Sequence, residues 1–348
     1  MGQRRLAFAL PILALLAGGS PVAAAGPGDV VVDEAAFASF LAGVRSEAIA
    51  RGLRAATVDQ ALAGVTPLRR IIQRDRSQAE FKLTLKIYRN RVVTPQTIDR
   101  GRSMAAKYRA LLEGVARRYR VQPRFILAIW GMETRYGAVE ANVPLIPALA
   151  TLAFDARRPR FFRAQLFSAL EIVDRGYIGL DRLYGSWAGA MGQPQFMPSS
   201  YLAYAADFDG DGKRDIWKNE GDVFASIANY LSKHGWRDDL TWGRAVRLPA
   251  AGTEAIATDV RRAAPGCRAQ TSERRRLSAW QALGVRRANG ADLPTRDIEA
   301  ALVLPEGRGG EAFLVYGNYA AIMAYNCAHL YAVTVGTLAD FIGTVGHD

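Results

Sequence analysis

One apolar helix near the middle of the chain constrains the fold most strongly. The segment PRFILAIWGMETRYG has apolar side chains at helical spacing. It begins with a proline, which suits the first position of a helix, and closes with a glycine, which suits the position just past the end of a helix. Phe125, Ile129 and Glu133 are four residues apart, so a carboxyl group occupies the stripe that should face the core. The sequence therefore predicts a helix over 123–135 with a buried glutamate.

This glutamate has two interpretations. It can be structural, by capping a neighbouring helix or pairing with an arginine. It can also be functional, because apolar surroundings disfavour the ionised form and raise the pKa of a carboxyl group. A carboxyl group that stays protonated near neutral pH can protonate the leaving oxygen of a glycosidic bond. The nearest other acids, Glu140 and Asp155, lie in less apolar contexts, so Glu133 is expected to act without a carboxylate partner.

The N-terminal 25 residues have the pattern of a secretory signal. Arg4 and Arg5 precede an apolar run that ends at Leu16, and three alanines that end at Ala25 supply an A-x-A cleavage site. The run is too short to span a bilayer comfortably, and no cysteine follows it as a lipid attachment point. We therefore expect a signal peptide over 1–25 and a periplasmic protein without a transmembrane segment.

The chain is strongly basic, which bears on its partners. The formal net charge is +12, and two arginines lie in the predicted signal, so the exported part carries +10. Nucleic acid, anionic lipid and bacterial cell wall would each suit this charge, as would a solvated basic surface without a partner. The basic residues are dispersed and no helix-turn-helix, RNP or zinc-finger pattern is present, which argues against nucleic acid.

Histidine and cysteine usage bears on the kind of site. The three histidines, His234, His329 and His347, do not have the spacing of a zinc site, and their number gives little support to Ser-His-Asp chemistry. The two cysteines, Cys267 and Cys327, would form either a disulfide or two unpaired buried thiols in an oxidising compartment. The sequence leaves both states open.

The chain is expected to be mainly helical, with one small β-containing part inserted late. Short β-type runs, RAVRL, AALVL and AFLVY, lie within 243–317 and are separated by glycines and prolines. SWAGAMGQPQFMPSS, which begins at Ser186, is rich in glycine, proline and serine and is expected to be a loop. Helical patterns cover residues 34–50, 57–64, 78–88, 95–119, 123–135, 159–176, 199–206, 222–234 and 328–342.

Six segments resemble the lytic murein transglycosylase B family and occur in order from about Gln78 to the C-terminus. They are FILAIWGMETRYG, ALATLAFDARRPRFF, GSWAGAMGQPQFMPSSY, DFDGDGKRDIW, SIANYLSKHGW and GNYAAIMAYNCAHLY. The resemblance implies a mainly α, lysozyme-like α+β catalytic core with an elongated groove. The expected parts are a signal peptide (1–25), an N-terminal helical domain (26–120), the catalytic core (121–242) with an EF-hand-like loop (207–222), a small β-containing subdomain (243–317) and a C-terminal helical segment that completes the groove (318–348).

The same resemblance implies a reaction on peptidoglycan. Members of the family cleave the β-1,4 bond between N-acetylmuramic acid and N-acetylglucosamine and leave a 1,6-anhydromuramic acid end, without a cofactor for the chemistry. The glutamate of the E-T-R-[WY]-G motif, here Glu133, would protonate the glycosidic oxygen and later deprotonate the C6 hydroxyl. The 2-acetamido group of the sugar would stabilise the developing charge, which agrees with the missing carboxylate partner.

Contacts with the saccharide also carry over from the resemblance. Ser186 matches the family serine near the acetamido group. Tyrosine rings suit the apolar faces of sugars, although a core position is the alternative for each of them. Phe161 stands where some members have tyrosine, Tyr136 replaces the commoner tryptophan, and Gln193-Pro194 replaces a Tyr-Gly pair. The groove residues matched by position are Tyr88, Phe161, Gln195, Tyr230, Tyr325, Asn326 and Tyr331.

DFDGDGKRDIW has the spacing of an EF-hand cation loop. Asp207, Asp209 and Asp211 take positions 1, 3 and 5, and Lys213 would offer its carbonyl at position 7. Position 12 is a lysine where a bidentate glutamate is required, and the family pattern favours Asp222 as its replacement. We expect a structural Ca²⁺ here, because adjacent carboxylates repel one another without a cation. An acidic turn without an ion is the alternative.

Two other functions remain compatible with the sequence. A hydrolytic muramidase of the same fold would let water attack the intermediate and would leave a reducing end. A non-catalytic cell-wall or calcium-binding protein would show no activity that depends on Glu133. The expected partners are peptidoglycan glycan strands and proteins of cell-wall synthesis.

Overall fold

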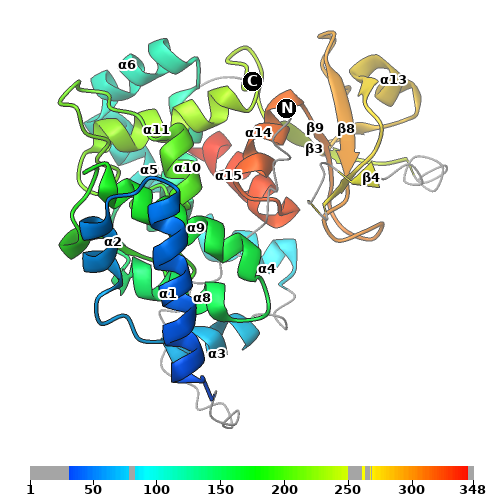
Figure 1. Cartoon of the computed structure of the whole chain (residues 1–348). Coiled ribbons are helices and arrows are strands. Elements are labelled where there is room, and N and C mark those ends of the chain that lie inside the picture. The colour runs from blue at the N-terminus through cyan, green and yellow to red at the C-terminus, as the bar shows by residue number, and fades with distance from the viewer. Residues whose placement is uncertain (1–30, 78–82, 250–260, 263–266, 268, 344–348) are drawn as a thin grey trace. The chain divides into compact units, whose positions relative to one another are not determined.

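The computed structural model describes residues 31–77, 83–249, 261–262, 267 and 269–343. They fold into two compact units, each assembled from separate stretches of the chain (Figure 1). The Glu133 unit contains residues 31–77 and 133–227, and the sheet unit contains the other described residues, within 83–132 and 228–343. The predicted signal over 1–25 lies outside the described residues. Among the described helices, none is both long enough and apolar enough to span a membrane.

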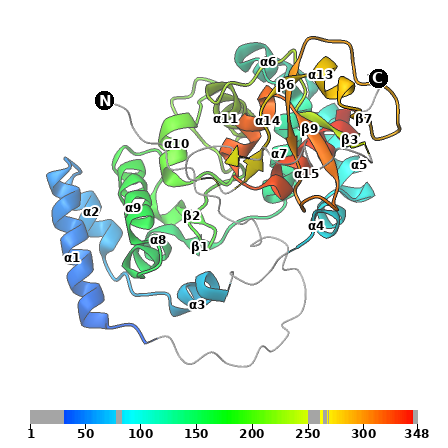
Figure 2. The same ribbon diagram turned by 90° about the vertical axis from the view of Figure 1, so that its right-hand side faces the viewer.

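The Glu133 unit is built around α8 (Leu145–Phe154), which is buried along nearly its whole length because LIPALATLAF is apolar on every side. The longer helix α9 (Pro159–Asp174), which has a proline in its first turn, packs against α8 (Figure 2). The other elements are α1 (Glu34–Ala50), α2 (Ala55–Leu62), α3 (Arg69–Ser77), α10 (Pro198–Tyr204), a 3-10 turn (Leu180–Arg182) and the antiparallel pair β1 (Val143–Pro144) and β2 (Tyr184–Gly185).

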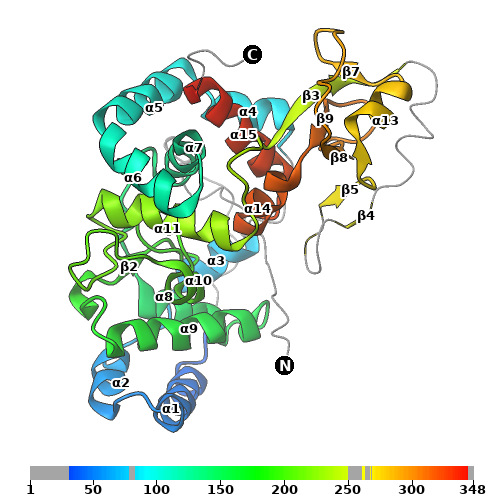
Figure 3. The same ribbon diagram turned by 90° about the horizontal axis from the view of Figure 1, so that it is seen from above.

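Helices form most of the sheet unit. The last helix packs against α4, α5 and α14 (Figure 3). Gly336 allows it to approach Trp242, since a Cβ at Gly336 would stand 2.3 Å from the indole ring. The boundary between the units falls within α7 and within α11 (Glu220–Lys233). The helices are α4 (Leu85–Val92), α5 (Pro95–Lys107), α6 (Arg109–Tyr119), α7 (Pro123–Thr134), α14 (Gly317–Tyr325) and α15 (His329–Gly343).

A five-stranded antiparallel sheet of order β6-β8-β9-β3-β7 completes the sheet unit (Figure 3). In its centre Leu302 of β8 lies opposite Leu314 of β9, and both belong to a small core around Trp280. Trp280 donates its indole N–H to the carbonyl oxygen of Ala300 (2.9 Å). The elements are β3 (Gly243–Arg247), β6 (Arg275–Arg276), α13 (Leu277–Ala282), β7 (Arg286–Arg287), β8 (Glu299–Val303) and β9 (Ala312–Val315).

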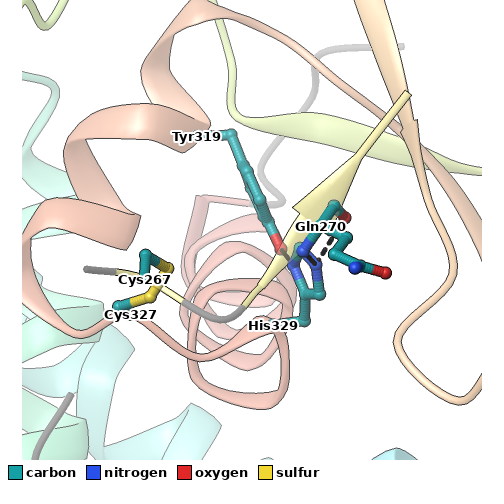
Figure 4. Close-up of a disulfide and its surroundings, with 5 residues drawn as sticks. All are labelled: Cys267, Gln270, Tyr319, Cys327 and His329. Carbon is teal, nitrogen blue, oxygen red and sulfur yellow. Dashed lines mark hydrogen bonds between the residues drawn. A yellow bond between two sulfur atoms is a disulfide. The ribbon is translucent and has the colours of Figure 1, made fainter. Parts of the chain in front are cut away.

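A second, two-stranded sheet is joined to the helices by a disulfide. β4 (Arg261–Arg262) pairs with β5 (Gln270–Thr271), and Cys267 is bonded to Cys327, which lies between α14 and α15 (Figure 4). The Cα atoms of the two cysteines are 5.7 Å apart, within the usual range for a disulfide. Of the two states that the sequence leaves open, the structure has the bonded one.

Tertiary contacts divide some elements that the sequence pattern joins. The helix expected over 95–119 is two helices, since the backbone departs from helical geometry at Tyr108 (φ −104°, ψ 23°), whose ring packs edge-on against Trp130 at 6.1 Å. The pattern misses α3, α8 and α13, and α8 shows no stripe because it is apolar all round.

Two further expectations concern the N-terminal part. The helix expected over 78–88 lies partly outside the described residues, and α4 begins at Leu85 after a cap by Thr84, whose hydroxyl accepts the N–H of Ile87 (3.2 Å). The expected helical domain over 26–120 is divided in the structure, because its described residues before position 78 belong to the Glu133 unit and those after position 82 to the sheet unit.

Candidate active site

Glu133 is the last residue but one of α7, and it is buried, with 3% of its surface exposed. This is the burial that the helical stripe of the sequence predicts. Thr134, which ends the helix, is buried as well. Its Oγ1 donates to the carbonyl oxygen of Gln193 (3.1 Å) and accepts the N–H of Gly137 (3.2 Å). Thr134 was not predicted from the sequence, although its place directly after Glu133 is a signal that could have identified it.

The chain leaves α7 through a left-handed turn. Arg135, Tyr136 and Gly137 have φ angles of 52°, 60° and 73°. Gln195, in the loop that follows β2, is a further non-glycine residue with positive φ, at 52°. A left-handed residue other than glycine costs roughly 1–2 kcal/mol, so the rest of the unit must hold these residues in place. Such conformations concentrate at functional sites.

The loop that carries Ser186 is held by its own backbone. The N–H of Ser186 donates to the carbonyl oxygen of Ala190 (2.7 Å), and Ser186 Oγ accepts the N–H of Ala190 (3.1 Å). Gly192 has a φ of 63°, and a Cβ there would stand 2.7 Å from the carbonyl oxygen of Ile216. Only glycine fits this close approach. Ser186 is half-buried and is fixed in orientation by the loop.

Two other predicted contact residues belong to the same unit. Gln195 is half-buried, and its Nε2 donates to the carbonyl oxygen of Gly192 (2.9 Å), within the same loop. Phe161 lies in the first turn of α9, half-buried, with its ring 5.1 Å from that of Phe162. Glu133, Phe161, Ser186 and Gln195 are therefore all in the Glu133 unit, and the Thr134 bond to Gln193 connects the end of α7 to the Ser186 loop.

The other buried carboxylates of the Glu133 unit have structural roles. Asp75 of α3 forms ion pairs with Arg157 (2.9 Å) and Arg158 (2.7 Å). Asp155 pairs with Arg76 of α3 (2.9 Å), so three ion pairs connect α3 with the turn before α9. Breaking such pairs would leave a buried charge without compensation. These aspartates therefore hold α3 in place and are unsuited to a role in chemistry.

Asp222, the remaining buried carboxylate of this unit, holds the acidic loop. Its two oxygens accept the N–H groups of Phe208 (2.8 Å) and Asp215 (2.7 Å). Burial raises the pKa of this carboxyl group, and these two backbone bonds oppose the rise. The side chain closes the loop through its backbone, whether or not a cation is bound.

Three carboxylates of the acidic loop converge. One side-chain oxygen from each of Asp207, Asp209 and Asp211 lies within 4.8 Å of the corresponding oxygens of the other two. Asp207 also accepts two backbone N–H groups of the loop, and Asn219 donates its side-chain amide to Asp209 (2.8 Å). This bond lowers the pKa of Asp209 and is the largest cause of the shift. Asn219 was not predicted from the sequence.

The remaining predicted contact residues belong to the sheet unit. Tyr230 donates its hydroxyl to the carbonyl oxygen of Ala324 (2.6 Å), and its ring lies 4.8 Å from Tyr325. Tyr325 is stacked at 6.5 Å on Tyr331, and Asn326 forms the C-cap of α14. The three tyrosine rings form a continuous cluster, and Asn326 directly follows Tyr325 in the chain. The side chain of Tyr325 is partly exposed, whereas Tyr331 is only 1% exposed and packs beneath the ring of Tyr325.

Tyr88 belongs to the same unit. It is on α4, which packs against α15, and it is 5% exposed. The structure therefore groups the predicted contact residues by unit, with three of them in the Glu133 unit and five in the sheet unit. All keep both interpretations, as sugar contacts or as packed side chains.

Comparison with known proteins extends over most of the chain. The family model described as transglycosylase SLT domain matches residues 36–340. Membrane-bound lytic murein transglycosylase B of Escherichia coli (strain K12) is 32% identical over 256 residues, which are 73% of this chain and 66% of that protein. The chain thus spans slightly less than two thirds of this relative.

Solved structures agree with the fold. SltB3 from Pseudomonas aeruginosa, in complex with NAG-anhNAM-pentapeptide, superposes with a TM-score of 0.81 at 42% identity, covering 88% of this chain and 80% of that one. The Escherichia coli lytic transglycosylase SLT35, in complex with calcium, gives a TM-score of 0.71 at 27% identity, covering 90% and 95%. The predicted fold class, mainly helical and lysozyme-like with a small antiparallel sheet, is confirmed. By the extent of the family match and these likenesses, the chain belongs to the transglycosylase SLT domain family.

Proposed function

We propose that this protein is a lytic transglycosylase that cleaves the β-1,4 bond between N-acetylmuramic acid and N-acetylglucosamine in peptidoglycan. The observation that carries the proposal is the burial of Glu133 at the end of α7, in the same unit as Ser186 and Gln195. In the proposed reaction this single carboxyl group serves as both acid and base. A relative bound to a NAG-anhNAM peptide supports the substrate class and the anhydro product.

In this mechanism Glu133 first donates its proton to the glycosidic oxygen, and the bond to C1 of the muramic sugar breaks. The 2-acetamido group of that sugar stabilises the positive charge at C1, and Ser186 would orient the acetamido group. Glu133, now ionised, removes the proton of the C6 hydroxyl, whose oxygen attacks C1. The products are a 1,6-anhydromuramic acid end and a free N-acetylglucosamine hydroxyl, without water or a cofactor.

Digestion of purified peptidoglycan tests the proposal. Wild-type protein should release muropeptides that are lighter than hydrolytic products by one water molecule, as measured by mass spectrometry. Products of the full hydrolytic mass would show a muramidase instead. Glu133→Gln keeps the size of the side chain and removes the proton donor, so the rate should fall by at least about two orders of magnitude. An unchanged rate in this variant would overturn the proposed role of Glu133.

For the acidic loop we propose a structural Ca²⁺ held by Asp207, Asp209 and Asp211, with the carbonyl of Lys213 as a further ligand. The converging carboxylates and the calcium complex of a related transglycosylase support this. Three hard oxygen donors suit Ca²⁺. Asp222 would shape the loop through its two backbone bonds. A bound ion would stiffen the wall of the unit and take no part in the chemistry.

We also propose that the protein works in the periplasm. The signal pattern over 1–25 and a relative that acts on murein support this location. Cell fractionation with N-terminal sequencing of the mature protein tests it, and the mature chain should begin at Gly26.

A further inference from the structure

The corner between α14 and α15 (residues 325–329) has few backbone bonds of its own. α14 ends at Tyr325, and its C-cap Asn326 has an extended backbone (φ −145°, ψ 115°). The N–H of Asn326 donates to Ile322, and the N–H of Ala328 donates to the carbonyl oxygen of Asn326 (2.8 Å). Two anchors from another part of the chain reach this corner. They are the disulfide from Cys267 and a hydrogen-bonded contact from Gln270 (Figure 4).

The first anchor is covalent and enclosed. Cys267 is 3% exposed and Cys327 is 8% exposed. Thiol–disulfide exchange requires that a thiolate reach one of the sulfur atoms, so burial protects this bond from exchange. The disulfide is therefore placed to act as a permanent clamp, and its position suits a redox switch poorly.

The second anchor is the imidazole of His329. Its Nδ1 lies 2.8 Å from the hydroxyl of Tyr319, and its Nε2 lies 2.8 Å from the carbonyl oxygen of Gln270 and 3.1 Å from the N–H of that residue. Tyr319 is only 2% exposed, so the ring of His329 gives a buried hydroxyl its hydrogen-bond partner. On the other side of the ring, Nε2 is bonded to the backbone of Gln270. Figure 4 shows the ring between the two partners.

Both anchors meet residues that the proposed function places against the saccharide. Tyr325 and Asn326 directly precede Cys327, and Tyr331 follows His329 on the first turn of α15. Tyr325 contacts Tyr230 and Tyr331 through its ring. A shift of the corner would therefore move the partly exposed ring of Tyr325.

We propose that the Cys267–Cys327 disulfide and His329 are positioning residues, which fix the corner so that Tyr325 and Asn326 meet the saccharide in one arrangement. This inference rests on the proposed function. The anchors act on binding and leave the proton transfers of Glu133 alone. If the unanchored corner adopts its binding arrangement only a tenth to a fifth of the time, affinity falls about fivefold to tenfold.

Binding and turnover test the proposal separately. The Kd of a tetrasaccharide of alternating N-acetylglucosamine and N-acetylmuramic acid is measured by calorimetry in the Glu133→Gln background. Three variants are made separately in this background: the Cys267→Ser/Cys327→Ser pair, His329→Ala and Tyr319→Phe. Each should raise Kd about fivefold to tenfold, or less for Tyr319→Phe, which keeps the disulfide and the bond to Gln270. With Glu133 intact, each should raise KM by the same factor and change kcat less than about twofold.

The matched control is Tyr316→Phe. Tyr316 is also a buried tyrosine of this unit, and its hydroxyl accepts from Arg244 (2.6 Å), away from the corner. It should lose stability without a change in Kd. His329→Gln, whose amide can donate to Gln270, should recover part of the affinity that His329→Ala loses.

Several outcomes would overturn the positioning role. One is an unchanged Kd in His329→Ala and Tyr319→Phe, variants that keep the disulfide and so stay informative if the serine pair does not fold. Another is a fall of kcat with unchanged KM. An equal rise of Kd in Tyr316→Phe would show a general loss of order instead. If the Glu133→Gln parent binds no saccharide, the proposed function fails and this inference fails with it, whereas binding by the parent with no effect of the variants overturns this inference alone.

Discussion

At the scale of single residues, the end of α7 combines a buried acid with a strained exit. Glu133 and Thr134 are buried, and Arg135 and Tyr136 follow in left-handed conformations. The hydroxyl of Thr134 bonds both to the turn at Gly137 and to the Ser186 loop. The threonine next to the proposed acid therefore ties the turn after α7 to the Ser186 loop.

Thr134→Val should expose the importance of this hydroxyl, since it keeps the shape of the side chain and loses both hydrogen bonds. The carbonyl of Gln193 and the N–H of Gly137 would lose a partner, which should lower the free energy of unfolding by about 1–2 kcal/mol. Activity on peptidoglycan should fall as well, because the Ser186 loop is no longer tied to the helix. Thr134→Ser keeps the hydroxyl and is the control. Equal stability of the two variants, measured by denaturant unfolding, would contradict the assignment.

At the scale of elements, the acidic loop contains three converging carboxylates, where we propose a cation site, and a fourth carboxylate that binds the backbone. The side-chain oxygens of Asp207, Asp209 and Asp211 converge, whereas each oxygen of Asp222 accepts a hydrogen bond from a backbone N–H group. The sequence pattern treats the four aspartates as one ligand set, and that set stays a prediction. In the structure Asp222 differs from the other three in accepting two backbone N–H groups from within the loop.

Calcium should stabilise the wild-type protein through the three converging aspartates. At a calcium concentration a hundred times Kd the gain is about 2.7 kcal/mol, so the melting temperature should rise by several degrees. Asp209→Asn should abolish most of this rise, and Asp99→Asn, at an exposed acid of the sheet unit, should keep it. Asp222→Asn should lower stability by about 1–3 kcal/mol even in chelator, because a backbone N–H loses its acceptor. Scanning calorimetry with calcium and with chelator distinguishes these outcomes, and no calcium response in the wild type would refute the site.

The helix that begins at His329 gives a pH-dependent contribution to stability. Burial lowers the pKa of His329 below 6.5, and the contact with Gln270 opposes this shift. Tyr319, whose hydroxyl is hydrogen-bonded to the imidazole of His329, has a raised pKa and stays neutral in the pH range in which histidine titrates. Below pH 6.5 the unfolded chain therefore takes up a proton that the folded protein resists, so stability falls as the pH drops through 6.5 toward the lowered pKa.

His329→Gln should make this fall shallower, because glutamine does not titrate. Denaturant unfolding at several pH values between 7.5 and 4.5 measures the difference between the two proteins. Parallel curves for wild type and variant would show that His329 does not contribute.

At the scale of the whole molecule, two compact units are each assembled from distant stretches of the chain. The disulfide contributes to the stability of the sheet unit, because it links residues separated by 60 positions in the chain. The Cys267→Ser/Cys327→Ser pair should therefore lose about 2–4 kcal/mol of stability, largely through the greater freedom of the unfolded chain. Comparison of the variant with oxidised wild type in denaturant checks this, and equal midpoints would contradict it.

Local pattern predicts much of the secondary structure and the burial of Glu133. The helix over 34–50 and the start of α7 at Pro123 follow from spacing and caps, and three strands of the five-stranded sheet follow from short apolar runs. These features depend on residues a few positions apart. A helix that is apolar all round, such as α8, has no such signal, and neither has the break at Tyr108.

The sequence by itself determined that a helix would carry an acid on its apolar stripe, because side chains four residues apart share one face. Only the tertiary structure decided what the other groups do. It paired Asp75 and Asp155 with arginines, turned Asp222 to the backbone and joined Cys267 to Cys327. These contacts connect residues far apart in the chain, and which partners meet is fixed by the packing of whole elements and is not set by local spacing.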